Sequence, residues 1–187
     1  MKRLLYIVVL LILVSGAYIA YPYWTLHRIE TALINQDVVA LETLFDWQQL
    51  RAGLKGDVRR VIIGKFGETS SAPADSVGAM LGLALGSTVI DSMIDAGVSA
   101  AGLVEVWRKG QLPQGKQPHD FVASAGFQSL TTFRVETRNP DDRQSPTVTF
   151  LMEFARAEWR VTRVVLPWEA FQAAAQAASQ TKGDRKR

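Results

Sequence analysis

The chain has 187 residues, which is enough for one modest domain and an appended segment. Hydrophobic residues make up 48% and charged residues 21%, which argues against a disordered chain and against a polytopic membrane protein. The lack of cysteine excludes disulfides, zinc ribbons and iron–sulfur clusters, and two histidines are too few for a histidine-rich metal site. We therefore expect neither a metal nor any other cofactor.

The net charge of +3 comes from the two ends of the chain. The stretch 182–187 contributes +3, and Lys2 and Arg3 contribute +2, so that residues 4–181 carry −2. A nucleic-acid-binding protein needs its positive charge on a folded face, because its affinity comes from contacts with phosphates. We therefore expect no nucleic-acid partner and treat residues 181–187 as a basic tail.

Residues 4–21 form an apolar run of 18 positions without a charge. As a helix this run is about 27 Å long, close to the thickness of a bilayer core. Lys2 and Arg3 precede it, which by the positive-inside rule leaves the N-terminus in the cytoplasm and the body of the protein outside. The run predicts a single-pass membrane anchor over residues 1–22, followed by one domain over residues 23–180. Four aromatic residues at its end are typical of an interfacial belt: Tyr18, Tyr21, Tyr23 and Trp24.

A cleaved signal peptide is the alternative interpretation of the same run. Ser15 and Ala17 have the small side chains and the spacing of a cleavage site, behind an apolar region of suitable length. The apolar and aromatic residues continue to Trp24, which favours an uncleaved anchor. Both interpretations predict that the rest of the chain is exported.

Helical periodicity follows the apolar run. Leu26, Ile29 and Leu33 recur on one face, and Asp37 is a suitable N-cap for a short helix over residues 38–45. A longer helix is predicted from Trp47 to about residue 66, with its apolar side chains on one face. The opposite face carries four basic residues, which we expect to be solvated: Arg51, Lys55, Arg59 and Arg60.

Residues 76–90 carry no charge, and Gly78, Gly82 and Gly86 recur at every fourth position within them. Glycines so spaced lie on one helix face and let another backbone approach closely. We expect a buried or self-associating helix over residues 77–94, because fifteen uncharged residues are too few to cross a bilayer unaided.

The end of this helix carries Asp91 and Asp95, one turn apart on the same side. Such a pair could bind a metal, but no further ligands lie nearby in the sequence, and we interpret it as a solvated face. Gly97 ends the helix, and Ser99 is the expected N-cap of the next helix, which continues to about Lys109.

The second half of the body predicts strands. Residues 110–126 are rich in Pro, Gly and Gln and indicate a loop, and alternating apolar residues then indicate strands over residues 131–136, 148–154 and 159–165. In the last strand the expected apolar face carries Trp159, Val161, Arg163 and Val165. A turn at residues 139–142 joins the first two strands, and a final helix begins at Pro167. Helices followed by an antiparallel sheet define the α+β class.

Three segments together resemble bacterial proteins of the DUF2939 family. Residues 45–55 (FDWQQLRAGLK) resemble the family signature V-D-F-x-x-L-R-x-S-L-K, residues 29–41 resemble its first helix pair, and residues 90–103 resemble its V-D-x-L-V-D stretch. The likeness extends from Tyr21 to Trp168. It implies a small exported or membrane-anchored bacterial protein and no known activity. Combined with the orientation predicted from Lys2 and Arg3, it leads us to expect a location at the bacterial inner membrane with the domain in the periplasm. The family signature falls on Asp46, Leu50, Arg51, Leu54, Lys55, Asp91 and Asp95.

By analogy alone, a helix pair packed on curved antiparallel strands also resembles NTF2-like and cystatin-like domains. Such a cone can enclose a pocket or be filled by side chains. Five aromatic residues would line a pocket or fill the core: Trp47, Phe133, Phe150, Phe154 and Trp159. No nucleotide-binding, metalloprotease or hydrolase motif occurs in the sequence.

Three functional hypotheses follow from these patterns. The first is a non-enzymatic envelope protein whose domain binds a protein partner, a lipid or a small apolar ligand. The second is an NTF2-like enzyme that uses a pocket carboxylate such as Asp46 or Asp120; His119 with Asp120 is the only neighbouring His–carboxylate pair. The third is an oligomeric membrane-associated protein that acts through residues 77–94. Asp46 is expected first of all to cap its helix and to pair with Arg51.

Overall fold

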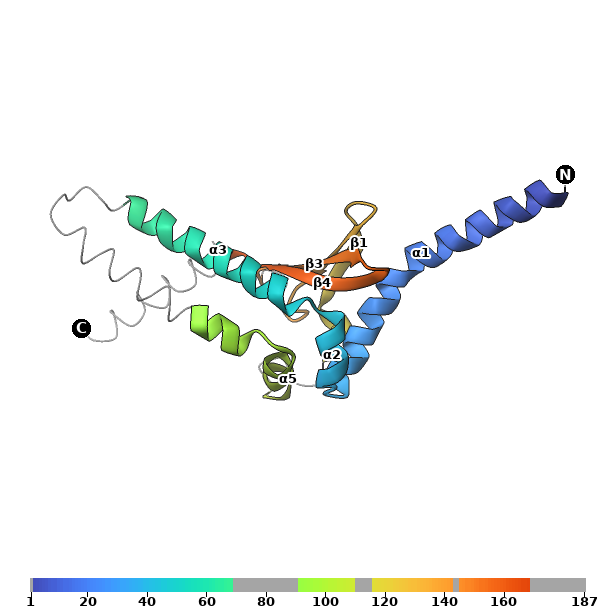
Figure 1. Ribbon diagram of the computed structural model, residues 1–187. Coiled ribbons are helices and arrows are strands. Elements are labelled where there is room, and N and C mark those ends of the chain that lie inside the picture. The colour runs from blue at the N-terminus through green and yellow to red at the C-terminus, as the bar shows by residue number, and fades with distance from the viewer. Residues whose placement is uncertain (1, 69–90, 110–115, 143–144, 169–187) are drawn as a thin grey trace, which may run out of the picture.

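The computed structural model describes residues 2–68, 91–109, 116–142 and 145–168, without the side chains of residues 61–68. The first element is one continuous helix, α1 (Lys2–Ile34). The apolar run and the amphipathic stretch after it therefore belong to a single helix. Its N-terminal half projects away from the body, and its second half lies along it (Figure 1).

Pro22 lies inside α1 and is buried against the body. Proline has no amide hydrogen and bends a helix rather than continuing it straight, and α1 bends where it reaches the sheet (Figure 1). Beyond the bend, Thr25, Ile29 and Ala32 are buried at helical spacing. The expected boundary at residue 22 thus falls within a helix whose second half is part of the domain.

Two helices follow α1 as the sequence predicts. The short helix α2 (Val38–Leu44) has Asp37 as its N-cap, and the Asp37 carboxylate accepts a hydrogen bond from the amide of Ala40. The helix α3 (Trp47–Glu68) runs beside the sheet (Figure 1). Between them, Phe45 forms a parallel bridge with Val161, so the link between α2 and α3 covers part of the edge strand.

The next described segment, residues 91–97, is helical and leads into α5 (Ala100–Arg108). The hydroxyl of Ser99 caps α5 by accepting a hydrogen bond from the amide of Gly102. The expected linker 69–75 and the glycines Gly78, Gly82 and Gly86 lie outside the described residues, as does most of the helix expected over residues 77–94. The same holds for the final helix after Pro167, apart from Trp168.

The strands form an antiparallel sheet in the order β1-β2-β3-β4: β1 (Val122–Phe127), β2 (Thr132–Thr137), β3 (Val148–Ala155) and β4 (Glu158–Val165). The fold class is therefore α+β, as predicted, and the sheet is not closed. The prediction of a loop over residues 110–126 is wrong for its last part, which forms the 3-10 helix η1 (Pro118–Phe121) and then β1. The alanines and the glycine of β1 give a weak strand signal.

The alternation predicted for β4 is also wrong in its second half. Val161 pairs with Met152, whereas Arg163 pairs with Leu151, so Thr162 is an extra residue on this strand. A bulge of this kind shifts the side-chain alternation by one position. Val164 therefore shares a face with Val161, and Arg163 and Val165 do not.

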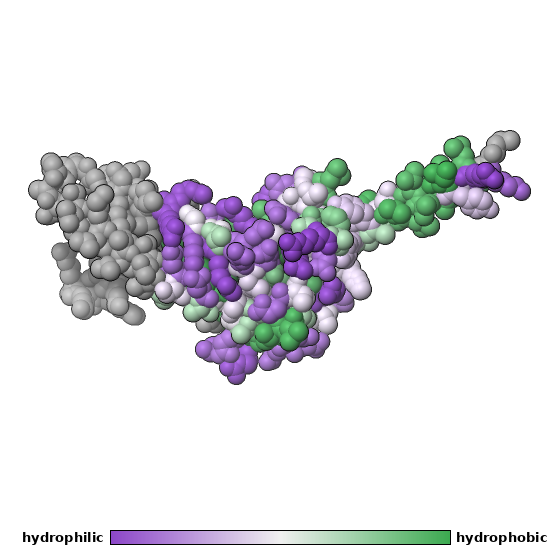
Figure 2. Space-filling model, viewed as in Figure 1, coloured by the Kyte–Doolittle hydropathy of each residue, from purple (hydrophilic) through white to green (hydrophobic). Residues whose placement is uncertain are grey.

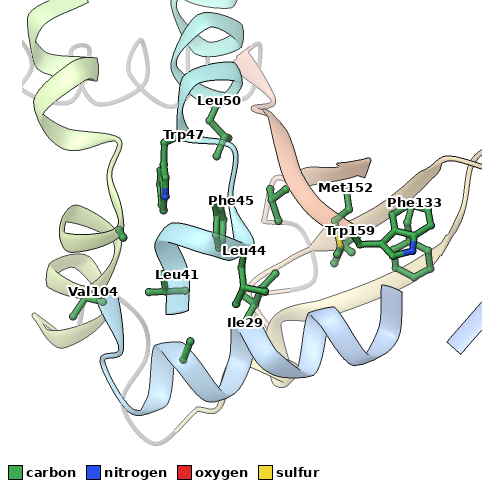
Figure 3. Close-up of a cluster of buried hydrophobic side chains, with 14 residues drawn as sticks. Ile29, Leu41, Leu44, Phe45, Trp47, Leu50, Val104, Phe133, Met152 and Trp159 are labelled. Carbon is green, nitrogen blue, oxygen red and sulfur yellow. The ribbon is translucent and has the colours of Figure 1, made fainter. Parts of the chain in front are cut away.

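The core connects the helices to the sheet. Figure 3 shows side chains of α1, α2, α3 and α5 packed in a row that continues to Met152, Phe133 and Trp159 of the sheet. Phe133 and Met152 are fully buried, and Trp159 is 2% exposed. A sheet covered by helices on its apolar face is the expected packing for this class.

A buried carboxylate joins α3 to the sheet. Asp57 is 6% exposed, and Arg163 Nη2 donates to its two carboxylate oxygens at 3.0 and 3.3 Å. Arg60 also reaches Asp57, at 3.2 Å, but its side chain is 76% exposed. The bulge in β4 is what places Arg163 at this contact.

We expect Arg163→Ala to lower the free energy of unfolding by about 1–2 kcal/mol, because it removes hydrogen bonds to a buried carboxylate. The matched variant Arg60→Ala removes a contact of an exposed side chain and should cost no more than about 0.5 kcal/mol. Urea unfolding of the detergent-solubilised chain, followed by tryptophan fluorescence, measures both. Equal losses in the two variants would contradict this role of Arg163.

Gly102 allows α5 to lie close to the end of the preceding helix. A Cβ atom at this position would lie 2.2 Å from the carbonyl oxygen of Gly97, far inside contact distance. The obstacle is backbone, which cannot rotate away as a side chain could.

Gly102→Ala should therefore destabilise the domain by about 1–3 kcal/mol, the usual range for overpacking. Gly56→Ala is the matched control, because nothing lies within 4 Å of a Cβ at position 56 of α3. This control should be neutral or gain up to about 1 kcal/mol of helix propensity. The same urea titration compares them, and a stable Gly102→Ala protein would show that α5 is free to shift.

Candidate functional site

A cavity of about 830 Å³ lies between the helices and the apolar face of the sheet. Its walls come from the second half of α1, the start of α3, the helix α5, the 3-10 helix η1 and all four strands. The lining is mostly apolar, with Leu26, Leu54 and Leu103 on the helices and Phe150 and Val164 on the sheet. A space of this size fits a small apolar ligand or part of a lipid chain.

The start of α3 forms one wall of the cavity. Asp46 caps this helix, since its carboxylate accepts a hydrogen bond from the amide of Gln49 at 3.0 Å. The amide of Asp46 in turn donates to the carbonyl of Val161 in β4 at 2.8 Å. Trp47 follows and stacks on Phe45, with ring centroids 4.8 Å apart and planes 16° apart. The cap and the strand contact together hold the Trp47 indole at the cavity wall.

The five aromatic residues expected to line a pocket divide into two groups. Trp47 and Phe150 line the cavity. Phe133, Phe154 and Trp159 pack instead in an aromatic cluster at the end of the sheet nearest the projecting half of α1. Figure 3 shows this separation, with Trp47 beside α5 and α2, and Phe133 and Trp159 on the sheet.

Tyr18 of α1 belongs to the same aromatic cluster. Its ring lies 5.3 Å from that of Phe154, 6.0 Å from that of Trp159 and 6.2 Å from that of Phe127. Tyr21 contacts Phe154 as well, at 6.4 Å. Tyr23 also packs against the sheet, with its ring 4.9 Å from that of Phe133. Three of the four residues of the expected interfacial belt therefore contact the sheet, and the fourth, Trp24, is 52% exposed.

A polar group lies at the edge of the cavity. His119 Nδ1 of η1 is 2.6 Å from Glu30 Oε1 of α1, and His27 Nδ1 is 3.5 Å from Glu30 Oε2. Both histidines of the chain thus lie against one carboxylate, and all three residues are part of the cavity lining. Asp120, the sequence neighbour of His119, is 3.7 Å from the other ring nitrogen.

The hydrogen bond to Glu30 raises the pKa of His119 above its ordinary value of 6.5, and the charges of Glu30 and Asp120 act in the same direction. A histidine whose pKa is raised on folding stabilises the folded state when it is protonated. This contribution is complete below about pH 6.5, the ordinary value, and is lost as the pH rises through the pKa of the folded state.

Glu30→Gln should therefore lower the pKa of His119 toward 6.5, because it removes the charge that favours the imidazolium form. An NMR titration of the imidazole protons measures this pKa directly. Glu105→Gln serves as a control, since Glu105 pairs with Arg108 and Lys109 on α5. A His119 pKa that is the same in Glu30→Gln and in the unmodified chain would show that the two side chains do not meet in solution.

Three of the four residues on the basic face of α3 contact residues 91–98, whereas the fourth, Arg60, is 76% exposed. Lys55 Nζ lies 2.6 Å from a carboxylate oxygen of Asp95, and Arg59 pairs with Asp91. Arg51 Nε donates to the carbonyl of Val98 at 2.8 Å, and so does not form the ion pair expected with Asp46. These three contacts form a ladder between α3 and residues 91–98, which run in opposite directions.

The ladder also corrects part of the interpretation of Asp91 and Asp95 as a solvated face: both acids are ion-paired, while the Asp95 side chain stays 53% exposed. Asp91 and Asp95 are four residues apart, and so are their partners Arg59 and Lys55. The spacing of the acids therefore matches the spacing of the bases. Both spacings are visible in the sequence. However, 22 residues separate Glu68 from Asp91, and no pattern in the sequence predicts that the basic face of α3 meets these acids. Among the described residues, no three or more His, Asp or Glu side chains are arranged so that they could hold a metal ion.

The family described as "Protein of unknown function (DUF2939)" matches residues 11–106, just over half of the chain. The chain belongs to the DUF2939 family. The match starts earlier than the resemblance had indicated and ends within α5, so that the sheet lies beyond it. No curated protein and no solved structure matches the chain. The likeness to NTF2-like or cystatin-like domains accordingly stays a prediction.

The DUF2939 match covers the helical part of the site. It includes α1 from residue 11, the capped start of α3, and both sides of the ladder. The signature residues have structural roles here: Asp46 caps α3, Leu50 is 2% exposed in the core, and Leu54 lines the cavity. No local pattern in the sequence indicates that Glu30 lies beside His119, because 89 residues separate them.

Proposed function

We propose that this DUF2939 protein is a membrane-anchored envelope protein whose domain binds an apolar ligand, such as a lipid acyl chain, in the cavity. The cavity of about 830 Å³ carries the proposal. Interiors are normally close-packed, so an apolar space of this size between secondary-structure elements is a site where a ligand fits. The apolar lining favours an aliphatic or aromatic ligand over a charged one.

The first half of α1 supports the anchor. This helix is long and apolar enough to cross a membrane, and a signal sequence has the same character. Residues 2–17 are exposed, and Figure 2 shows a continuous hydrophobic surface along the projecting half of α1. In water this hydrophobic surface would stay exposed, which is unfavourable, whereas the hydrocarbon core of a bilayer would cover it.

The charges beside the helix support an orientation. Lys2 and Arg3 precede the apolar segment, so we propose that the N-terminus lies in the bacterial cytoplasm and the domain in the periplasm, at the inner membrane. In this arrangement the membrane that anchors the chain also contains the proposed class of ligand.

The placement of the candidate acids favours binding over catalysis. Asp46 is occupied as a helix cap, and Asp120 accepts a hydrogen bond from the amide of Gln117 at 2.8 Å. The carboxylate at the cavity edge is Glu30, which is held by His119. These assignments support a non-catalytic role, in preference to an NTF2-like enzyme with Asp46 or Asp120 as its acid or base.

Val164→Trp tests the proposal, because an indole at position 164 would occupy part of the cavity. Val165→Trp is the matched control: residue 165 is the next position on β4, is 40% exposed and does not line the cavity. The purified chains are reconstituted in liposomes that contain a fatty acid with a photoreactive group at its chain end. Crosslinked peptides are then mapped by mass spectrometry.

In the unmodified chain we expect crosslinks both in α1 residues 4–17 and in cavity peptides that contain Leu103 or Phe150. Val164→Trp should reduce the cavity crosslinks at least several-fold and leave those in α1 unchanged, whereas Val165→Trp should change neither. Crosslinks confined to α1 in the unmodified chain would overturn the binding proposal while leaving the anchor intact.

A further inference from the structure

The turn between β1 and β2, residues 128–131, lies against the apolar half of α1. The Tyr18 hydroxyl donates a hydrogen bond to the carbonyl of Leu130, and the ring of Tyr18 stacks on Phe127 just before the turn. The side chain of Leu130 itself is 82% exposed, the highest fraction among the large hydrophobic residues described. A bulky aliphatic residue is thus displayed next to a helix that has the composition of a membrane span.

The same end of the sheet carries a second turn. In an antiparallel meander, the β1–β2 and β3–β4 turns lie at one end and the β2–β3 turn at the other. The Tyr21 hydroxyl donates to the carbonyl of Ala157 in the β3–β4 turn at 3.3 Å. This end of the sheet therefore faces the projecting half of α1, and hydrophobic colour marks the tip of the β1–β2 hairpin (Figure 2).

The length of α1 fixes how close this end comes to a bilayer. The apolar run covers residues 4–21, but Tyr18 and Tyr21 are already in contact with the sheet. Only residues 4–17 are both uncharged and free of the body, and these give a helix of about 21 Å. A bilayer core is about 30 Å thick, so the next residues must supply the difference.

We propose that the β1–β2 turn enters the interfacial layer of the same bilayer that holds α1, with the Leu130 side chain in contact with lipid. This surface consists of Gln128, Ser129, Leu130 and Thr131, and its partner is the membrane itself. The inference rests on the proposed anchor: if residues 18–21 lie at the membrane surface, the turn hydrogen-bonded to Tyr18 lies there too. The domain then contacts the membrane at a helix and at a turn, and two contacts fix its orientation.

Single-cysteine variants test this in the full chain, which has no native cysteine. Leu130→Cys and Gln128→Cys are labelled with an environment-sensitive nitrobenzoxadiazole fluorophore and reconstituted in phosphatidylcholine–phosphatidylglycerol liposomes. Quenching is measured with lipids that carry a nitroxide near the headgroup. Val39→Cys is the matched control, because Val39 is 77% exposed on α2, away from the apolar half of α1 (Figure 1).

The label at position 130 should be quenched at least threefold more than the label at position 39, with a blue-shifted emission, and position 128 should follow the same trend. Ile12→Cys, measured with a nitroxide near the chain end, reports on the anchor separately. Strong quenching at position 12 with position 130 at the level of position 39 would overturn the turn contact and leave the anchor in place. Absence of quenching at position 12 would overturn the anchor, and the turn contact with it.

Discussion

The packing of α1 against the sheet is the contact on which the other features depend. Tyr18 and Tyr21 bring the helix onto the aromatic cluster around Trp159, and Pro22 is buried at the bend that follows. Beyond it, Ile29 enters the core and Leu26 and Glu30 form a wall of the cavity. A single helix thus provides the apolar segment, a core element and part of the candidate site, so the position of the cavity relative to the apolar segment is set by the secondary structure.

The starts of α2, α3 and α5 could be predicted from the sequence because their signals are local, whereas the continuity of α1 through Pro22 could not. Asp37, Asp46 and Ser99 each act as the expected N-cap, and the caps set the helix starts. The sheet was predicted less completely. The strand β1 contains alanine, serine and glycine, whereas β-branched residues would have indicated a strand. In β4, the bulge at Thr162 shifts the side-chain alternation by one position, and the regular pattern in the sequence does not reveal this shift.

The candidate site could be predicted only in part, because it depends on contacts between distant segments. The sequence predicted five aromatic residues that line a pocket or fill the core. Trp47 and Phe150 line the cavity, whereas Phe133, Phe154 and Trp159 belong to the aromatic cluster. Which apolar residues leave space and which fill it is decided by packing in three dimensions. The ladder from Lys55 to Asp95 shows the same limit: the matching spacings are visible, but their pairing is not.

The continuity of α1 has a geometric consequence for the family. Because adjacent residues of an α-helix are related by about 100° of rotation and 1.5 Å of rise, each residue added or removed between the projecting half and Tyr18 would turn the domain about the helix axis. The number of residues in the projecting half of α1 therefore determines the side of the helix axis on which the cavity lies. With the proposed membrane anchor, a chain whose apolar half is longer or shorter by one residue would turn the cavity toward a different direction along the membrane surface, with no change inside the domain.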